Sequence, residues 1–191
     1  MNVVEERILK DGKVYPGHIL KVDGFLNHRI DVKLLMEMAD LVYEHFKDKE
    51  ITKILTIEAS GIAIATIIAQ RFGVPLVFAK KSKTKNIAGD VYTSKVESYT
   101  HGTVYDIIVS REYLDSSDKV LLVDDFLAMG NALMGLMKLV EDADASLTGI
   151  AIAIEKGFQG GGDKIREMGA DLYSVAVIDE MTDDGKIIFR K

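Results

Sequence analysis

The sequence predicts an α/β protein in which a parallel sheet is flanked by helices. Apolar runs typical of strands recur at residues 53–58, 74–80, 119–125 and 147–155. Helical segments separate the first run from the second and the third from the fourth. Strand, helix and strand in succession form a βαβ unit, which implies a parallel sheet covered on both faces. The length is sufficient for one domain with a proper core, so we expect a single domain over residues 1–191.

The N-terminal part is expected to place an extended segment between two helices. Residues 2–10 can form a short helix that ends at the Asp-Gly pair 11–12. Residues 14–30 contain two glycines, one proline and no helical period, so we expect extended chain with turns. Asp31 is a suitable N-cap for a helix over residues 32–46, because apolar residues recur there with helical spacing.

The centre of the chain differs from the regular strand and helix pattern. After a nearly all-apolar helix over residues 62–73, residues 80–90 are polar and rich in lysine. Residues 91–100 then alternate between apolar and polar side chains, and residues 103–110 can be their hairpin partner. We interpret this segment as a mobile flap more than as part of the core.

The C-terminal part resumes the alternation of helices and strands. Its expected elements are a helix at 131–143, a short helix near 163–168, a strand at 171–178 and an edge strand at 185–191. No internal repeat, low-complexity tract or linker divides the chain.

Composition excludes several classes of function. The net charge of −6 argues against a nucleic-acid surface, because phosphate contacts need clustered Lys and Arg. The chain has no cysteine for a disulfide or a thiolate zinc site. The histidines lack the HExxH spacing of a metalloprotease; they are His18, His28, His45 and His101. The first residues are not those of a signal peptide, and no apolar run approaches membrane-spanning length. We therefore expect a cytoplasmic protein without nucleic-acid or membrane partners.

Two adjacent acids, Asp124 and Asp125, end the third strand and precede a loop with one glycine and then a helix. Such a loop presents unpaired N–H groups and the positive end of the helix dipole, which suits a phosphate. Gly130 allows close approach of the backbone, and the carboxylates suit hydroxyl groups or a divalent cation. Ribose 5-phosphate meets both requirements, and the loop lacks the lysine of a Walker-type site. The alternative is that Asp125 is a helix-entry acid and Gly130 an ordinary turn residue.

A second loop, at residues 58–61, also carries an acid and a glycine between a strand and a helix. In an open parallel sheet, ligands bind beyond the carboxyl ends of the strands, so this loop and the first are expected at one edge. Its N–H groups could bind a diphosphate. The alternative is a plain strand-to-helix turn, which has the same residue pattern.

These stretches carry a resemblance to a known family. "VLLVDDFLAMGNA" (residues 120–132) and "IEASG" (residues 57–61) resemble the phosphoribosyl diphosphate motif and the diphosphate loop of the type I phosphoribosyltransferases. "ILKVDGFLNHRID", "ITKILTIEASGIA", "VDDFLAMGNA" and "IAIAIEKGFQ" together are similar to the bacterial xanthine phosphoribosyltransferases. The resemblance implies the type I phosphoribosyltransferase fold, with residues 1–30 contributing to a hood over the base and about 82–110 forming a flexible flap. It also implies a homodimer.

The implied reaction moves a phosphoribosyl group from 5-phosphoribosyl 1-diphosphate to a purine ring nitrogen, which demands positioning and electrostatics. The resemblance gives Asp124 and Asp125 the catalytic role of holding the ribose hydroxyls. The 5-phosphate would be held by Ala128, Met129, Gly130, Asn131 and Ala132. The diphosphate would be contacted by Glu58, Ala59, Ser60, Gly61, Lys80 and Lys81, with magnesium bound mainly through the diphosphate rather than by direct protein ligands.

The phosphate loop departs from the family pattern, and the lysines at residues 80–85 allow more than one interpretation. Many family members have hydroxyl residues in the phosphate loop, so here backbone N–H groups and the helix dipole would replace side-chain donors, and we expect Met129 to be tolerated. In dimers of the family, a lysine such as Lys80 or Lys81 often reaches in from the neighbouring subunit. Lys83 and Lys85 we interpret as solvated.

The residues of the base site would select the purine. Lys156 would donate to an oxo group and reject the amino group of adenine, and Phe158 could stack on the ring. The hood would add Asn27 at the 2-oxo side and the backbone around Leu20. The alternative is a surface lysine and a core phenylalanine. Xanthine is thus the expected acceptor, with guanine or hypoxanthine as the competing reading. A ligand-sensing regulator with this fold is disfavoured by the acidic net charge.

Overall fold

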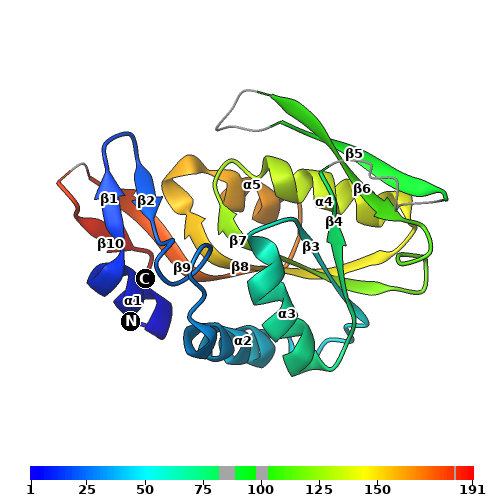
Figure 1. Cartoon of the computed structure of the whole chain (residues 1–191), viewed down its shortest axis with the longest axis horizontal. Helices are drawn as coiled ribbons and strands as arrows, with labels where there is room; N and C mark the ends of the chain where they lie inside the picture. Colours follow the sequence, from blue (N-terminus) through cyan, green and yellow to red (C-terminus); the bar gives the residue numbers. More distant parts are fainter. Residues whose placement is uncertain (82–88, 98–102, 183) are drawn as a thin grey trace.

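The computed structural model describes residues 1–81, 89–97, 103–182 and 184–191. Within these residues, a central six-stranded sheet has the order β10-β9-β8-β7-β3-β4 (Figure 1). Its strands are β3 (Lys53–Ile57), β4 (Leu76–Ala79), β7 (Lys119–Leu127), β8 (Ser146–Lys156), β9 (Leu172–Met181) and β10 (Ile187–Phe189). All neighbours are parallel except β10, which pairs with β9 in the antiparallel sense as the expected edge strand. The predicted α/β class is confirmed.

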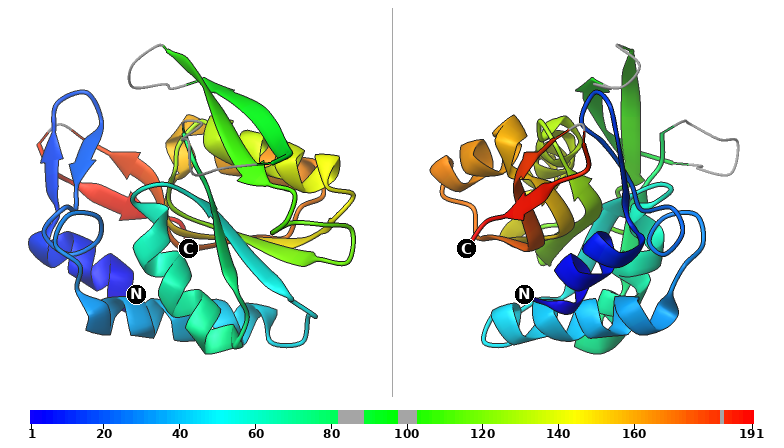
Figure 2. Two further views of the ribbon diagram at one scale, coloured as in Figure 1. Left: turned by 45° about the vertical axis from the view of Figure 1, so that its right-hand side comes forward. Right: turned by 90° about the vertical axis from the view of Figure 1, so that its left-hand side faces the viewer.

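Helices cover both faces of this sheet (Figures 1 and 2). One face packs against α1 (Val3–Asp11), α2 (Val32–Phe46) and α3 (Gly61–Phe72), and the other against α4 (Asn131–Asp142) and α5 (Gly161–Glu167). Strand β7 contributes alternate residues to the two apolar clusters. Its Leu121 and Val123 belong to the first cluster, and Val120 and Leu122 belong to the second. This alternation is what a strand buried on both faces requires.

Local capping explains where the N-terminal helices begin. Asn2 and Glu5 form a capping box at the start of α1, in which each side chain accepts a hydrogen bond from the other residue's backbone N–H. The side chain of Asp31 accepts from the N–H of Leu34 and starts α2, as predicted. In the described ranges, no helix is long and apolar enough to cross a membrane.

The expected extended segment near the N-terminus contains a short hairpin. Strands β1 (Lys13–Tyr15) and β2 (Ile19–Lys21) pair in the antiparallel sense and stand beside β9 and β10 (Figure 1). The chain then turns back across the sheet edge, where Phe25 and Leu26 are buried in the first apolar cluster. We call residues 13–30 the hood.

The expected flap contains the predicted hairpin, with β5 (Val91–Glu97) paired to β6 (Val104–Ser110) in the antiparallel sense. One face of it is buried, and more of it belongs to the core than the sequence indicated. A Cβ on Gly135 of α4 would lie 2.5 Å from Cγ2 of Val96, so the missing side chain lets β5 pack closely on α4. Residues 82–88 and 98–102 of the expected flap lie outside the described residues.

Candidate active site at the carboxyl edge of the sheet

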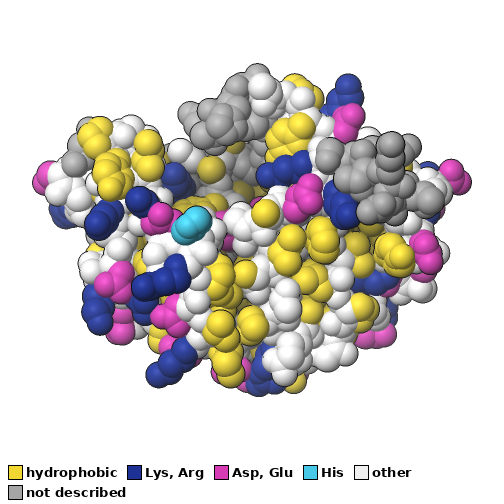
Figure 3. All heavy atoms as spheres, in the orientation of Figure 1, with side chains coloured by type: hydrophobic (Ala, Val, Ile, Leu, Met, Phe, Trp, Pro, Cys, Tyr) yellow, Lys and Arg dark blue, Asp and Glu magenta, His cyan; other side chains and the backbone are white. Residues whose placement is uncertain are grey.

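The two adjacent acids lie inside β7 rather than at its end. The sequence predicted that the strand ends at Asp125, but β7 continues to Leu127 because its pairing with β8 extends to Leu127 opposite Glu155. Both acids are buried, at 6% exposure each. The surface above this edge is hollowed between the hood and the β5–β6 hairpin (Figure 3).

Asp125 connects three segments that the sequence assigned to the site. Its Oδ1 accepts a hydrogen bond from Ser60 Oγ at 3.0 Å, and its Oδ2 accepts one from Asn27 Nδ2 at 3.0 Å. The acid therefore joins the hood, the second loop and β7. The structure brings these three predicted residues together around one carboxylate.

Asp124 holds a proton more strongly than an ordinary carboxyl group. Burial, and then the negative charge of Asp125, raise the pKa of Asp124 well above its usual value; the backbone N–H of Asp125 and, to a smaller extent, Lys81 oppose this rise. Its Oδ1 accepts the N–H of Asp125 at 2.9 Å. Tyr105 of β6 lies close enough that the charge of Asp124 adds to burial in raising the pKa of the phenol. A protonated Asp124 can donate to a ligand oxygen, whereas Asp125 acts as an acceptor in both of its hydrogen bonds.

Residues 128–132, which we call the phosphate loop, combine a strand end with the start of α4. Gly130 is the N-cap residue, with φ of 88°, and no side chain caps the helix. A Cβ at Gly130 would meet Ile165 Cδ1 at 3.4 Å, an ordinary contact, so the left-handed conformation rather than space requires glycine. The first N–H groups of a helix have no intrahelical partner, and at the start of α4 no side chain accepts a hydrogen bond from them.

The side chains of Met129 and Asn131 in the phosphate loop provide few donors for an anion at the start of α4. Met129 is 42% exposed. Asn131 Nδ2 donates to the carbonyl of Glu97 at 3.1 Å, which ties the loop to the end of β5. Binding of an anion by this loop would therefore depend on its backbone.

The loop at residues 58–61 is held by side chains. Glu58 Oε1 accepts the N–H of Lys81 at 2.6 Å, and Ser60 donates to Asp125. The peptide bond between Glu58 and Ala59 is cis. A Cβ on Gly61 would lie 2.3 Å from Thr56 Oγ1 and 2.9 Å from Asp124 Oδ1, so only glycine allows α3 to begin this close to β3 and β7. The four residues thus lie at the edge where the sequence expected them.

The two predicted lysines point in different directions. Lys81 Nζ lies 5.5 Å from the ring centroid of Tyr105, on the side of Asp124. Lys80 Nζ lies 5.9 Å from the ring centroid of Phe78 and lines an apolar groove of about 500 Å³ along the edge strand β4. Lys83 and Lys85 lie outside the described residues.

The base end of the site is formed by the carboxyl end of β8 and the tip of the hood hairpin. Lys156 Nζ donates to the carbonyl of His18 at 2.9 Å and lies 6.0 Å from the ring centroid of Phe126. Burial lowers the pKa of Lys156. The rings of Phe158 and His18 are 5.3 Å apart, at 47° to each other. Leu20 is buried and is the second residue of β2 after the turn.

Three further residues belong to this region that the sequence did not assign to it. His18 was noted only as an isolated histidine, and its carbonyl role leaves no trace in a sequence. Phe126 directly follows the paired acids, in the stretch expected to be a short loop, and was not singled out. Gly161 was missed although it lies in the run Gly160–Gly162 beside an expected helix, which is a signal of close backbone packing.

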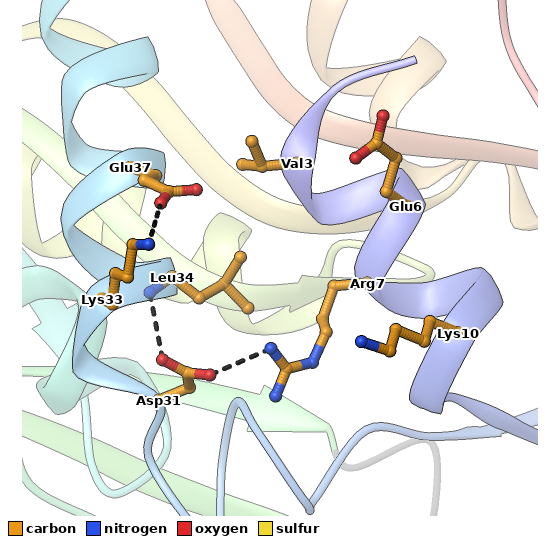
Figure 4. Close-up of a pocket in the computed structure, with 8 residues that line it drawn as sticks. All are labelled: Val3, Glu6, Arg7, Lys10, Asp31, Lys33, Leu34 and Glu37. Carbon is orange, nitrogen blue, oxygen red and sulfur yellow. Dashed lines mark hydrogen bonds and ion pairs between the residues drawn. The ribbon is translucent and has the colours of Figure 1, made fainter.

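A separate crevice lies between α1 and α2 (Figure 4), and none of the predicted site residues lines it. It has a volume of about 260 Å³. Its charged side chains pair with one another, with Arg7 3.0 Å from Asp31 and Lys33 3.9 Å from Glu37. We assign no ligand to it.

Comparison with known proteins identifies the family of the chain. Residues 23–183 match the model of the phosphoribosyl transferase domain. The chain belongs to the phosphoribosyltransferase family. The matched range contains both loops, the paired acids and Lys156, and omits only the two ends of the chain.

Relatives of this phosphoribosyltransferase match it over its full length. It is 54% identical over 191 residues to a xanthine phosphoribosyltransferase of Lachnoclostridium phytofermentans, covering 100% of this chain and 98% of the relative. It is 54% identical over 192 residues to a xanthine phosphoribosyltransferase of Bifidobacterium adolescentis, covering 100% of each.

Solved structures of more distant proteins share the fold. The adenine phosphoribosyltransferase of Giardia lamblia with 9-deazaadenine superimposes with a TM-score of 0.79 at 26% identity, covering 93% of this chain and 98% of that one. The adenine phosphoribosyltransferase of Trypanosoma brucei has a TM-score of 0.75 at 20% identity, covering 92% of this chain and 79% of that one. The predicted type I phosphoribosyltransferase fold is confirmed.

Proposed function

We propose that this phosphoribosyltransferase transfers the 5-phosphoribosyl group of 5-phosphoribosyl 1-diphosphate to xanthine, forming xanthosine 5'-monophosphate and diphosphate. One observation carries the proposal: the paired acids, a helix-start amide loop and Lys156 meet at a single sheet edge. The identity of 54% to xanthine phosphoribosyltransferases supports the choice of base.

The sugar lies against the paired acids and the phosphate loop. Asp124 and Asp125 offer their carboxyl oxygens to the two ribose hydroxyls, and the raised pKa of Asp124 favours its protonated form, which can also donate a hydrogen bond. The 5-phosphate accepts hydrogen bonds from the backbone N–H groups at the start of α4, where the helix dipole stabilises negative charge. As the bond from C1 to diphosphate breaks and the bond from the purine nitrogen forms, the carboxylate of Asp125 stabilises positive charge on the ribose ring.

The diphosphate lies over residues 58–61. Lys81 is placed to neutralise part of its charge, because its side chain is on the Asp124 side of the loop. Magnesium would be bound mainly through the diphosphate, because it prefers phosphate oxygens and water to a dedicated protein cage. Bound in this way, magnesium would neutralise charge on the departing diphosphate.

Lys156 selects the base. An ammonium group donates to a 6-oxo group, whereas the amino group of adenine would meet it donor against donor and leave a buried polar group unpaired. The two adenine phosphoribosyltransferase structures compared above are 26% and 20% identical to this chain and supply the fold rather than the base site. Asn27 offers an amide to the 2-oxo side, and Phe158 offers a ring face. Guanine and hypoxanthine share the 6-oxo group and remain the competing acceptors.

The remaining segments have proposed roles that follow from their positions. The β5–β6 hairpin closes over the sugar and excludes water, being linked to the phosphate loop through Asn131 and Glu97. A second copy of the chain covers the apolar groove along β4, where Phe78 is 38% and Tyr113 55% exposed. Lys80, which lines this groove, extends toward that second copy. The cytoplasmic location stays a prediction.

The test is a panel of purines at saturating 5-phosphoribosyl 1-diphosphate, with diphosphate release as the readout. We expect kcat/KM to be highest for xanthine and lowest for adenine. Lys156→Met should lower kcat/KM for xanthine about 100-fold, because the half-buried donor to the oxo group is lost. Lys164→Met, on the exposed side of α5, is the matched control and should change it less than about twofold.

Two outcomes would contradict the proposal. A higher kcat/KM for guanine than for xanthine would reassign the base while leaving the transferase in place. Failure of every purine to release diphosphate, together with tight and specific binding of DNA in a gel-shift assay, would favour the regulator.

A further inference from the structure

We infer that the first turn of α5, locked in place by Glu155 and Arg166, supports the phosphate loop from behind and sets the position of its amides. This makes Arg166 and Gly161 positioning residues for the sugar phosphate. The inference rests on the proposed function, because it takes the phosphate loop as the site of the 5-phosphate.

The first turn of α5 is in direct contact with the backbone of the phosphate loop. A Cβ on Gly161 would lie 2.2 Å from the carbonyl oxygen of Ala128 and 2.8 Å from the backbone nitrogen of Gly130. No side chain can occupy that space unless the loop moves. Ile165, one helical turn later and fully buried, lies beside Gly130. Helix α5 is therefore the surface against which the phosphate loop rests.

An ion pair between the buried Glu155 and the half-buried Arg166 fixes that first turn from the other side. Glu155 is 0% exposed, and its two carboxylate oxygens accept from Arg166 Nη1 at 2.9 Å and Nη2 at 2.7 Å. The hydroxyl of Ser174 on β9 donates to the same carboxylate. A Cβ on Gly162 would lie 1.9 Å from Glu155 Oε1. The turn is thus enclosed between the ion pair on one side and the phosphate loop on the other.

The geometry of the pair indicates a role in orientation rather than in stability alone. A buried ion pair contributes little net stability, because desolvation offsets the attraction, whereas a bidentate Arg–carboxylate pair fixes orientation. Glu155 is in register with Leu127, the last residue before the phosphate loop, and it directly precedes Lys156. Displacement of the pair would therefore shift the loop amides and, secondarily, the lysine that reads the base. Among the described residues, the loop at residues 58–61 makes no hydrogen bond to α5.

The direct test is Gly161→Ala, with binding of ribose 5-phosphate and of magnesium diphosphate measured separately by calorimetry. The added methyl group should push the loop by a fraction of an ångström and raise the Kd for ribose 5-phosphate about tenfold or more. The Kd for diphosphate, which binds at the other loop, should change less than about twofold. Gly169→Ala is the matched control. Gly169 ends the same helix with φ of 86° and has nothing within 4 Å of an added Cβ, so it carries backbone strain without loop contact.

A second variant, Arg166→Lys, keeps the charge but loses the two-pronged contact. We expect it to raise the KM for 5-phosphoribosyl 1-diphosphate about threefold with kcat less affected, and it decides the matter if Gly161→Ala does not fold. Unchanged ribose 5-phosphate binding in both variants would overturn the inference, as would equal weakening of both ligands, which indicates general loosening. Failure of the unmodified protein to bind ribose 5-phosphate would instead refute the assignment of the loop itself, and with it the proposed function.

Discussion

The two ligand loops at the carboxyl edge of the sheet are built in opposite ways. The phosphate loop depends on its backbone: Gly130 is left-handed, no side chain caps α4, and Met129 points to solvent. The loop at residues 58–61 depends on side chains, since Glu58 accepts the N–H of Lys81 and Ser60 donates to Asp125. The two loops therefore respond differently to substitution, although both lie between a strand and a helix.

The difference follows from what lies behind each loop. The phosphate loop rests against α5, whose glycines leave no room for side chains, so its shape is imposed by backbone packing. The loop at residues 58–61 leads to Gly61, which lies against Asp124 and Thr56, so its shape depends on the paired acids. The phosphate loop suits a phosphate that is bound by several backbone amides. The loop at residues 58–61 suits a diphosphate that must be bound and then released as the leaving group.

Among substitutions that test this contrast between the two loops, the largest expected effect comes from breaking the backbone conformation of the phosphate loop. Gly130→Ala forces a side chain into a left-handed conformation, at a cost of about 1–2 kcal/mol. We expect kcat/KM for 5-phosphoribosyl 1-diphosphate to fall about 30-fold, because the amides no longer converge. Gly73→Ala, at φ of 70° after α3 with nothing within 4 Å of the new Cβ, should cost similar stability and leave kinetics unchanged. Equal kinetic losses in both variants would show that strain alone is responsible.

An intermediate effect concerns Asp124, against which the other loop is packed. Unfolded Asp124 loses its proton near the usual value of 3.8, whereas the folded protein retains the proton to higher pH. Between these values the folded state binds more protons, so the free energy of unfolding falls as pH rises. Asp124→Asn removes this fall and should gain stability relative to the unmodified protein above about pH 4, as measured by urea unfolding from pH 4 to pH 8.

A control with the opposite sign is Asp184→Asn. The hydroxyl of Thr182 lowers the pKa of Asp184, so its contribution to stability is present above the unfolded pKa and is lost as the pH falls. A constant stability difference between Asp124→Asn and the unmodified protein over the whole range would mean that folded Asp124 is ionised at pH 4.

The smallest expected effects sharpen the contrast between the loops. Ser60→Ala removes one hydrogen bond to a carboxylate and should raise the KM for 5-phosphoribosyl 1-diphosphate about threefold to tenfold. Met129→Ala in the phosphate loop removes an exposed side chain and should change it less than about twofold. Steady-state kinetics at saturating xanthine measure both. A larger effect of Met129→Ala than of Ser60→Ala would contradict the division into backbone and side-chain loops.

The sequence predicted the fold well because its signals are local. Alternation of apolar strands and helices, the N-cap at Asp31 and the glycine after α3 depend on near neighbours and are confirmed. The predicted end of β7 at Asp125 was wrong, because two adjacent acids usually interrupt a buried strand. Here the pairing with β8 holds Asp124 and Asp125 in the strand. Burial of the hairpin was underestimated because it depends on Gly135, a residue of a distant helix.

The site was only partly predictable, for a similar reason. The two loops and Lys156 follow strands of one sheet, so topology alone brings them to the same edge. The hydrogen bond from Asn27 to Asp125 and the carbonyl of His18 at Lys156 join residues far apart in sequence. Contacts of this kind depend on tertiary geometry, which no pattern of spacing encodes. The roles of individual site residues stay predictions.

The bond between Asn27 and Asp125 has a consequence for the sequence of events in catalysis. The amide that would recognise the purine is held, before any ligand arrives, by the carboxylate that would take the sugar. A ribose hydroxyl that binds Asp125 would release Asn27, and the amide would then be free to turn toward a ring. The protein would thereby become receptive to its acceptor once the donor is in place, and an idle enzyme would retain little affinity for free base.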